Sequence, residues 1–262
     1  MNLNIKRLST QSDFDACIEL QNKIWGLKEL GQTSPITLKA LSMTNPSIGL
    51  IMGAFDKENM VGMCIVLGTL EKGVAYGHMI GVLDTYRDYK IGNSLLKALI
   101  KELKKQGIKE MVCTFEPLES RNAHLYINRQ GGRVIAYQAD CFQVDTTMHE
   151  GLPLDRMVMR MDIEQPFEQK ENISLSKALK SYPQANPENM PDADAVLVEI
   201  PGDLASLKEH NMESAQRFRN DTRLVFSEYL NQRGFVSGNF FSGKTSKGRQ
   251  SFYLLTGKQY EH

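Results

Sequence analysis

The residues 81–93, GVLDTYRDYKIGN, have the types and spacing that best suit chemistry in this sequence. An aliphatic run ends in a polar turn, and an amphipathic helix is predicted to follow from Gly92. The four unpaired N–H groups and the dipole of a helix start suit a pyrophosphate without a metal ion. Arg87 and Lys90 add positive charge. The segment predicts a phosphate-binding turn; the alternative is a surface turn with incidental basic residues.

The elements around this turn follow from hydrophobic periodicity. Residues 73–83 read as a strand, and a helix with Leu95, Leu99 and Leu103 on one face ends at the left-handed stop Gly107. A buried strand over 110–115, a helix from Ser120 to the glycines 131–132 and a strand over 133–138 are expected next. Earlier in the chain, the pattern predicts a strand over 2–8, helices from 12 and from 35, and a strand meander over 47–70.

Two segments in this order carry a family resemblance. Residues 82–93 resemble motif A of the GNAT superfamily of acyltransferases, although Lys90 stands where that family usually has glycine, so the loop is expected to bend differently. The segment TFEPLESRNAHL, followed by Gly131 and Gly132, looks like motif B. With GLPLDR at 151–156, these segments closely resemble a subfamily of mostly uncharacterised GNAT acyltransferases.

The resemblance implies an α/β (α+β) GNAT fold: a mixed central sheet with splayed strands, flanked by helices, and a small C-terminal α+β extension. It implies acetyl-CoA or another acyl-CoA as cosubstrate and no metal. The pantetheine arm would run between diverging strands at 76–83 and 110–115, and the Val82 amide would bond the acyl carbonyl. The implied cofactor-binding residues are Val82, Leu83, Arg87, Asp88, Tyr89, Lys90, Ile91, Gly92, Asn93 and Asn122.

Transfer to an amine needs a proton acceptor whose pKa lies near the working pH. His78 shares a strand face with Ile80 and Val82, and its place four residues before Val82 resembles that of a catalytic histidine in the aralkylamine branch of the superfamily. A half-buried structural histidine is the alternative. Glu116, after the second splayed strand, is the other candidate base, since apolar neighbours could raise its pKa. Its alternative role is to stabilise the following helix start.

Many family members use a tyrosine on the motif B helix to protonate the departing thiolate. Counted back from Gly131, that position falls on Ile127, and Tyr126 is displaced by one residue, roughly 100° around a helix. Tyr126 is therefore the candidate acid only if the register differs. Otherwise the thiolate leaves unassisted or takes a proton from water.

The resemblance implies a small-molecule amine acceptor, with a free amino acid as the expected substrate and acetyl or succinyl as the acyl group. Arg121 and Arg156 are candidates to bind a carboxylate on the acceptor or the acyl group, because a guanidinium matches a carboxylate in a bidentate way. Surface ion pairs are their alternative role. Trp25 is either a lining residue of the acceptor pocket or part of the core.

Composition excludes several partner classes. The 31 basic and 31 acidic residues balance, so neither nucleic acid nor an anionic membrane is favoured. The four cysteines lie far apart, three of them in apolar stretches, and are expected to be reduced. Neither a secretory signal nor a membrane span is recognisable, which predicts a cytoplasmic protein.

The domain organisation expected from composition is an acyltransferase domain over 1–163, a linker over 164–193 rich in Gln, Glu, Lys, Asn and proline, and a C-terminal α+β subdomain over 194–262. The last contains a strand over 195–200, a long helix towards Asn231 and a possible hairpin. It would cover the acceptor site, extend the sheet or mediate a homodimer.

Two functions follow. The first is an acyl-CoA-dependent N-acyltransferase that acts by direct attack on the thioester. The second is a non-catalytic acyl-CoA sensor or interaction module, which the displaced tyrosine and Lys90 leave open. An unrelated nucleotide-binding protein is disfavoured, because no glycine-rich phosphate signature follows a strand.

Overall fold

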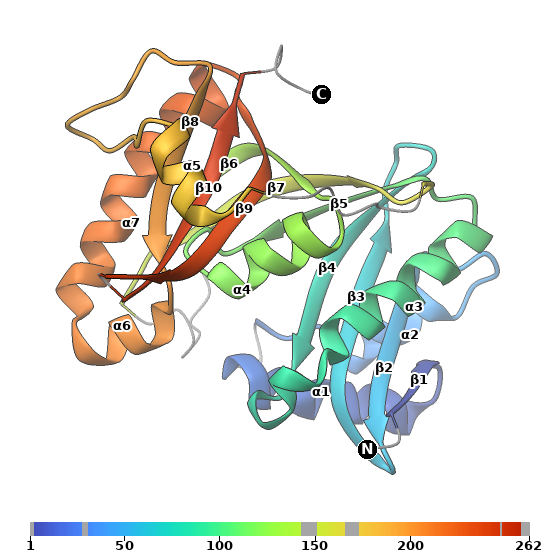
Figure 1. Ribbon diagram of the computed structural model, residues 1–262. Helices are drawn as coiled ribbons and strands as arrows, with labels where there is room; N and C mark the ends of the chain where they lie inside the picture. The colour runs from blue at the N-terminus through green and yellow to red at the C-terminus, as the bar shows by residue number, and fades with distance from the viewer. Residues whose placement is uncertain (1–2, 28–30, 143–150, 166–172, 247, 258–262) are drawn as a thin grey trace. The chain divides into compact units, whose positions relative to one another are not determined.

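The computed structural model describes residues 3–27, 31–142, 151–165, 173–246 and 248–257 (Figure 1). The chain forms two compact units. Unit 1 comprises Met1–Cys113, Val144–Glu150 and Asp162–Gln165, and unit 2 comprises Thr114–Gln143, Gly151–Met161 and Pro166–His262. This division differs from the boundary expected near residue 164, because the strands after residue 133 pair with the C-terminal strands.

Unit 1 is built on a sheet in the order β1-β2-β3-β4-β5. Its strands are β1 (Leu3–Arg7), β2 (Gly49–Asp56), β3 (Asn59–Gly68), β4 (Val74–Val82) and β5 (Glu110–Phe115), whose last two residues belong to unit 2. The first four strands are antiparallel neighbours, and β4 and β5 are parallel. The expected meander and the mixed sheet are confirmed.

Three helices accompany this sheet. They are α1 (Gln11–Trp25), α2 (Pro35–Ser42) and α3 (Ile91–Lys105). The side chain of Thr10 caps α1 in a capping box with Asp13, and Ser34 caps α2 ahead of Pro35. The buried face of α3 contains Ile91, Leu95, Leu96, Leu99 and Leu103. Gly107 has the left-handed backbone (φ 75°) expected of a helix stop.

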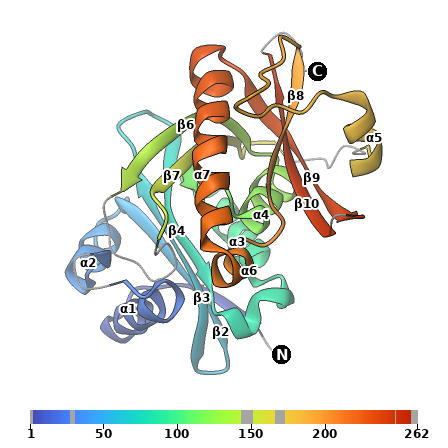
Figure 2. The same ribbon diagram turned by 90° about the vertical axis from the view of Figure 1, so that its left-hand side faces the viewer.

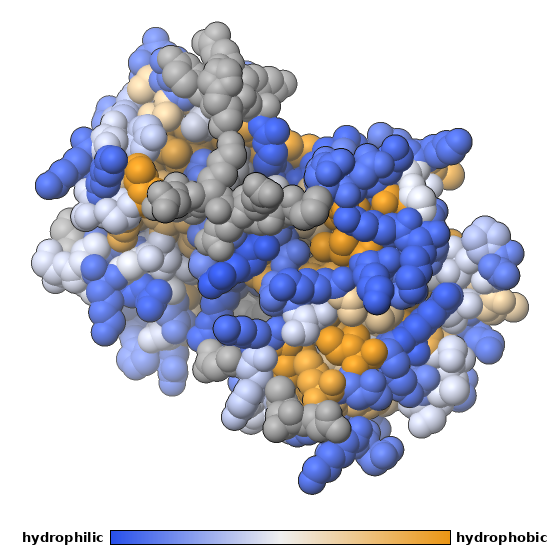
Figure 3. All heavy atoms as spheres, turned by 45° about the vertical axis from the view of Figure 1, so that its right-hand side comes forward, coloured by the Kyte–Doolittle hydropathy of each residue, from blue (hydrophilic) through white to orange (hydrophobic). Residues whose placement is uncertain are grey.

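The core of unit 1 under α1 and α2 is apolar. It joins the helices to β2 and β3 through Leu8, Phe14, Cys17, Leu20, Leu38, Ile51, Phe55, Met63 and Ile65. These residues alternate along the strands and recur every three or four positions in α1. The apolar faces that the strand and helix periodicities define are therefore buried in one core. The face of the molecule in Figure 3 is mostly hydrophilic, with apolar side chains in a few small groups.

Unit 2 has its own sheet order, β7-β6-β9-β10-β8. Its strands are β6 (Arg133–Phe142), β7 (Leu154–Asp162), β8 (Ala195–Pro201), β9 (Val236–Thr245) and β10 (Gly248–Thr256). The expected C-terminal hairpin is present as the antiparallel pair β9 and β10, and Ser237 of β9 pairs with Val134 of β6. The C-terminal strands therefore extend the sheet that β6 and β7 begin.

The helical elements of unit 2 are α4 (Ser120–Ala123), the π-helix η3 (His124–Arg129), α5 (Leu175–Ser181), α6 (Leu204–His210), α7 (Met212–Phe226) and the π-helix η4 (Ser227–Gln232). The long helix expected towards Asn231 is broken at Asn211, whose side chain accepts from the Ser214 N–H and caps α7. Figure 2 shows α7 running past β6 and β7.

The two faces of the unit 2 sheet are covered by different helices. Tyr253, the cross-strand partner of Phe240, packs its ring against both Phe240 and Phe226 of α7. Phe252 and Phe241, the next pair along, join a cluster with Ala178 of α5. Residues 173–193, expected to be linker, thus contribute a packed helix, and Ala185 N–H also bonds the Leu197 carbonyl at 2.8 Å. The expected linker residues 166–172 lie outside the described residues.

Candidate active site

His78 lies at a break in both ladders of β4. On β3, Val66 pairs with Gly77 and Ile65 pairs with Met79, so His78 is the extra residue of a β-bulge. On the other side, the pairing of β4 with β5 ends at Gly77 and Cys113. His78 is therefore the first residue of β4 beyond the parallel ladder, where a bulge turns a side chain out of the regular alternation.

The imidazole of His78 has a polar neighbour and remains exposed. Its Nε2 lies 3.3 Å from the Thr33 hydroxyl, and its ring lies 6.4 Å from that of Tyr76. Desolvation by the surroundings lowers the pKa of His78 from 6.5, although the side chain still reaches solvent. A lowered pKa keeps the ring neutral at pH 7, which is the form that accepts a proton.

The register of β4 decides which of its amides face β3. The Leu83 N–H donates to the Val61 carbonyl at 2.9 Å. In an antiparallel ladder the bonded pairs alternate, so the amide of Gly81 also faces β3, while those of Ile80 and Val82 point to the opposite side. On that side of β4, the pairing with β5 ends at Gly77, before Ile80 and Val82.

The expected role of the Val82 amide is compatible with this register. The expected contribution of the Leu83 amide is not, because that N–H is already bonded to β3.

The β4–α3 turn, residues 83–93, consists of the 3₁₀ helix η2 (Asp84–Tyr89), Lys90 and the start of α3. Lys90 is the N-cap of α3 and has φ 59°, in the left-handed region that favours glycine. This explains why glycine is the usual residue there in the family that the turn resembles. No side chain caps α3, so the first-turn amides, which include Ile91 and Gly92, are not covered by a side-chain acceptor.

The side chains of Asp84, Arg87 and Lys90 in the β4–α3 turn are exposed. Arg87 forms an ion pair with Asp84 three residues earlier, and the Lys90 side chain is also exposed. The Tyr86 hydroxyl bonds Asp56 at 3.3 Å, and the Tyr89 ring lies 6.2 Å from that of Tyr86. An exposed ion pair such as that of Arg87 is worth little by itself, so its guanidinium can exchange a carboxylate for a phosphate.

Trp25 packs against Gly81, the residue before Val82. A Cβ at Gly81 would lie 2.6 Å from Cη2 of Trp25, so only glycine allows the end of α1 to approach β4 this closely. Trp25 is partly buried and also packs against the unit 1 core. It thus has a structural role beside β4.

The carboxylate of Glu116 is buried and paired. Its side chain is 4 % exposed and forms an ion pair with Arg219 of α7, and a second with Arg156 at 3.4 Å. It also accepts from the Leu118 N–H at 3.0 Å. Two guanidinium groups and an amide already bind the two carboxylate oxygens, which opposes the role of general base. Its stabilising role before α4 is visible instead, and Glu119 caps that helix by accepting from the Arg121 N–H.

Further buried charges join Glu116. Asp155 of β7 is completely buried, lies 3.7 Å from Arg219 and accepts from Arg223 at 2.6 Å and 3.0 Å. The Tyr137 hydroxyl also donates to Asp155. Burial alone would raise the pKa of Asp155, but these donors outweigh it and lower the pKa. We call the set Glu116, Arg156, Arg219, Asp155, Arg223 and Tyr137 the Glu116 network.

Tyr126 and Asn122 lie on the helix that follows. Tyr126 is 7 % exposed, its ring lies 5.2 Å from that of Phe115, and it belongs to the π-helix η3. The Asn122 N–H bonds the Glu119 carbonyl at 3.0 Å within α4. A π-turn spans one residue more than an α-turn. This changes the register that the sequence count assumed for Tyr126.

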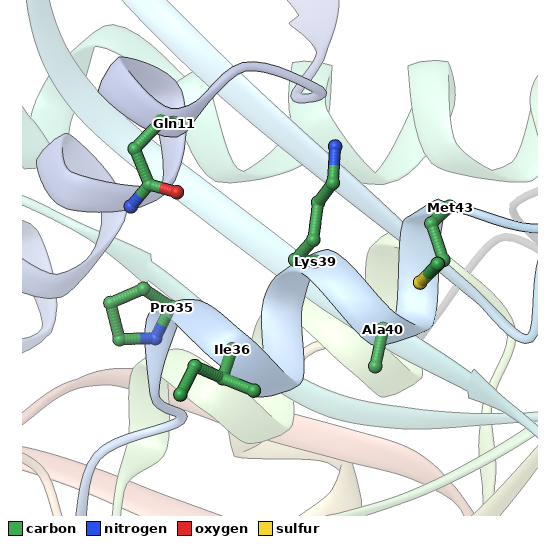
Figure 4. Close-up of a pocket in the computed structure, with 6 residues that line it drawn as sticks. All are labelled: Gln11, Pro35, Ile36, Lys39, Ala40 and Met43. Atoms are coloured by element: carbon green, nitrogen blue, oxygen red, sulfur yellow. The ribbon is translucent and has the colours of Figure 1, made fainter.

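A shallow pocket lies on unit 1, away from the β4–α3 turn in sequence. It is lined by Gln11 of α1, by four residues of α2 and by Met43 (Figure 4). Ile36 is 82 % exposed there, and the single charged lining residue is Lys39. No predicted site residue lines it.

The described residues contain no group of three or more His, Cys, Asp or Glu that could hold a metal ion. Within the same part of the chain, no helix is long and apolar enough to cross a membrane. Cys17, Cys64 and Cys113 are buried thiols, and burial raises the pKa of Cys64 and Cys113 to about 12.

A mixed sheet in which a parallel ladder ends beside an uncapped helix start is the architecture expected of a CoA-dependent acyltransferase. Residues 14–131 match the acetyltransferase (GNAT) family. The match covers 118 of the 262 residues and gives that segment as a GNAT acetyltransferase domain, which indicates a transferase of the GNAT type. A search of curated proteins found no match.

Solved structures share the fold. The ribosomal-protein-S18-alanine N-acetyltransferase of Escherichia coli is 18% identical, with a TM-score of 0.51, over 66% of this chain and 100% of its own. A GNAT acetyltransferase of Streptococcus pneumoniae is 16% identical, with a TM-score of 0.50, over 62% and 99%. At these identities the likeness concerns the fold alone. Each match leaves a third or more of this chain uncovered.

Proposed function

We propose that this protein transfers an acetyl or succinyl group from coenzyme A to the amine of a small molecule, with a free amino acid as the expected acceptor. The observation that carries the proposal is the β4–α3 turn. The turn joins β4, in which the amides of Ile80 and Val82 point away from β3, to a helix start that has no side-chain cap. The exposed cations Arg87 and Lys90 lie in the same turn. The helix start would bind the pyrophosphate of CoA, and the Val82 amide would bond the acyl carbonyl.

His78 is the proposed base. The acceptor nitrogen attacks the thioester carbonyl carbon, the C–S bond breaks from the tetrahedral intermediate, and the amine proton passes to the neutral imidazole directly or through water. The lowered pKa and the exposed position of His78 support this role. Glu116 is a poorer candidate, because its carboxylate is buried between Arg219 and Arg156.

Tyr126 is the proposed acid for the CoA thiolate, and Asn122 the proposed polar contact on the same helix. The π-helix η3 supports the choice of Tyr126. With one extra residue in its turn, Tyr126 would take the angular position that an α-helix gives to Ile127. Arg121, whose side chain is exposed on α4, would be available to bind an acceptor carboxylate, whereas Arg156 is already paired with Glu116.

The test is to incubate the protein with acetyl-CoA or succinyl-CoA and amino acid pools and to follow thiol release. Release that requires an amine supports the proposal, and mass spectrometry of the pool identifies the product. Thermal stabilisation by CoA without turnover would instead support a sensor. Calorimetry that detects no binding of CoA would overturn both.

A further inference from the structure

The C-terminal third of unit 2 contacts the connection between β5 and α4 through side chains of two elements, α7 and β10. Arg219 of α7 pairs with Glu116, and the Tyr253 hydroxyl of β10 donates to the Pro117 carbonyl at 2.9 Å. The Ser251 and Ser120 hydroxyls lie 2.9 Å apart. These contacts fall on the segment 116–120, which lies inside the part of the chain that matches the GNAT family.

The same C-terminal third also contacts the helix itself. The Asn128 amide donates to the Phe240 carbonyl of β9 at 2.8 Å. Since Asn128 lies in η3, the helix that carries Tyr126 is held at both ends by strands from beyond residue 235.

Glu116 is the point where this support is strongest. One oxygen accepts from both Arg219 and the Leu118 N–H, so the carboxylate joins α7 to the first turn after β5. Arg219 is 1% exposed and also lies 3.7 Å from Asp155. A buried carboxylate that loses its guanidinium is left as an uncompensated charge, which strongly destabilises the arrangement around it. The position of the turn therefore depends on Arg219.

We infer that Arg219 and Tyr253 are positioning residues for the transfer reaction, and that they act through the β5–α4 connection on Asn122 and Tyr126. This rests on the proposed function, in which those two residues take part. The C-terminal third is then a built-in support for the second half of the acyltransferase domain. An acid that is misplaced by about 1 Å can cost on the order of a hundredfold in rate.

The experiment uses the full chain with two mild variants, Arg219→Lys and Tyr253→Phe. Lysine keeps the charge but loses the fork that reaches Glu116 and Asp155, and phenylalanine keeps the ring contacts with Phe226 and Phe240. The matched control is Arg217→Lys, the same change on the exposed side of the same helix.

We expect kcat to fall about tenfold or more in both variants, while the Kd of CoA, set by the β4–α3 turn of unit 1, changes by less than about twofold. Amide hydrogen exchange over 116–129 should speed up, with no change over 91–105. Arg217→Lys should match the wild type in every measurement.

Unchanged kcat and unchanged exchange over 116–129 in folded variants would overturn the inference. An equal loss of CoA affinity and of kcat, together with faster exchange everywhere, would also overturn it and indicate general destabilisation. If the wild type itself transfers no acyl group, the proposed function fails, and the exchange pattern alone decides whether Arg219 and Tyr253 position the helix.

Discussion

The β4–α3 turn of unit 1 and the Glu116 network of unit 2 both contain predicted site residues with charged side chains. The two regions differ in whether those charges are exposed or buried. Arg87 and Lys90 are exposed, and the ion pair of Arg87 with Asp84 is local. Glu116, Arg219 and Asp155 are buried and form ion pairs across long sequence separations. An exposed cation stays free to meet a ligand, whereas a buried pair fixes a structure. The comparison supports the proposal that the turn binds the ligand and that the network stabilises the structure.

The largest effect is expected at His78, the proposed base in unit 1. The variant His78→Gln should lower kcat about 10²- to 10⁴-fold with little change in CoA affinity. Because the pKa of His78 is lowered, its base form is lost only as pH falls through a value below 6.5. A pH profile of kcat should therefore show an acid limb below 6.5 in the wild type that is absent in the variant. If the acid limb persists in His78→Gln, a group other than His78 causes that limb.

The next effect tests the buried side of the comparison. Arg219→Met should lower the free energy of unfolding by about 3–5 kcal/mol, because it leaves Glu116 buried without its main partner. The double variant Glu116→Gln, Arg219→Met should be more stable than Arg219→Met alone, since it removes the unpaired charge. Urea unfolding measures both. Additive losses in the double variant would contradict a direct pairing.

A smaller effect is expected for the exposed cation of the turn. Arg87→Gln should weaken CoA binding by about tenfold, with little change in stability, because the ion pair of Arg87 with Asp84 is exposed. The loss should shrink as salt is added, since exposed charges are screened. The control is Lys101→Gln, which removes an exposed charge from a later turn of α3. Equal affinities of the two variants in calorimetry would remove Arg87 from the binding site.

The smallest effect separates backbone conformation from charge at Lys90. Lys90→Gly should relieve a left-handed backbone and stabilise unit 1 by up to about 1 kcal/mol, while it weakens CoA binding through the lost charge. Lys57→Gly is the matched control, because Lys57 has φ 56° in the turn between β2 and β3. It should stabilise to a similar degree and leave CoA affinity unchanged. Thermal unfolding and calorimetry distinguish the two variants.

Much of unit 1 could be predicted from the sequence because its signals are local. The strand β5 begins and ends at the expected residues, and α2 begins at Pro35 as expected. The β4–α3 turn was recognisable because a polar segment between a strand and an amphipathic helix needs no distant partner. Lys90 illustrates the limit: its identity was visible, but its left-handed backbone was not.

The environment of Glu116 could not be predicted, because its partner Arg219 lies 103 residues away. The sequence favoured a raised pKa from the apolar neighbours Phe115 and Pro117, and no local pattern indicates a guanidinium from α7. The break at Asn211 was missed because the helical periodicity continues through it, and only the capping bond to Ser214 shows the new start. The bulge at His78 depends on the register of β3, which the sequence leaves open.

By itself, the sequence determined the order of elements around the β4–α3 turn, the family resemblance and the residue types available for the chemistry. These depend on short-range periodicity and on residue identity. Only the tertiary structure decided which amides of β4 face away from β3, that Glu116 is enclosed by arginines, and that the C-terminal third supports the helix of Tyr126. Those properties arise from contacts between residues distant in sequence, for example 22 residues apart for Val61 and Leu83 and 103 for Glu116 and Arg219, and the packing of the whole unit selects these contacts.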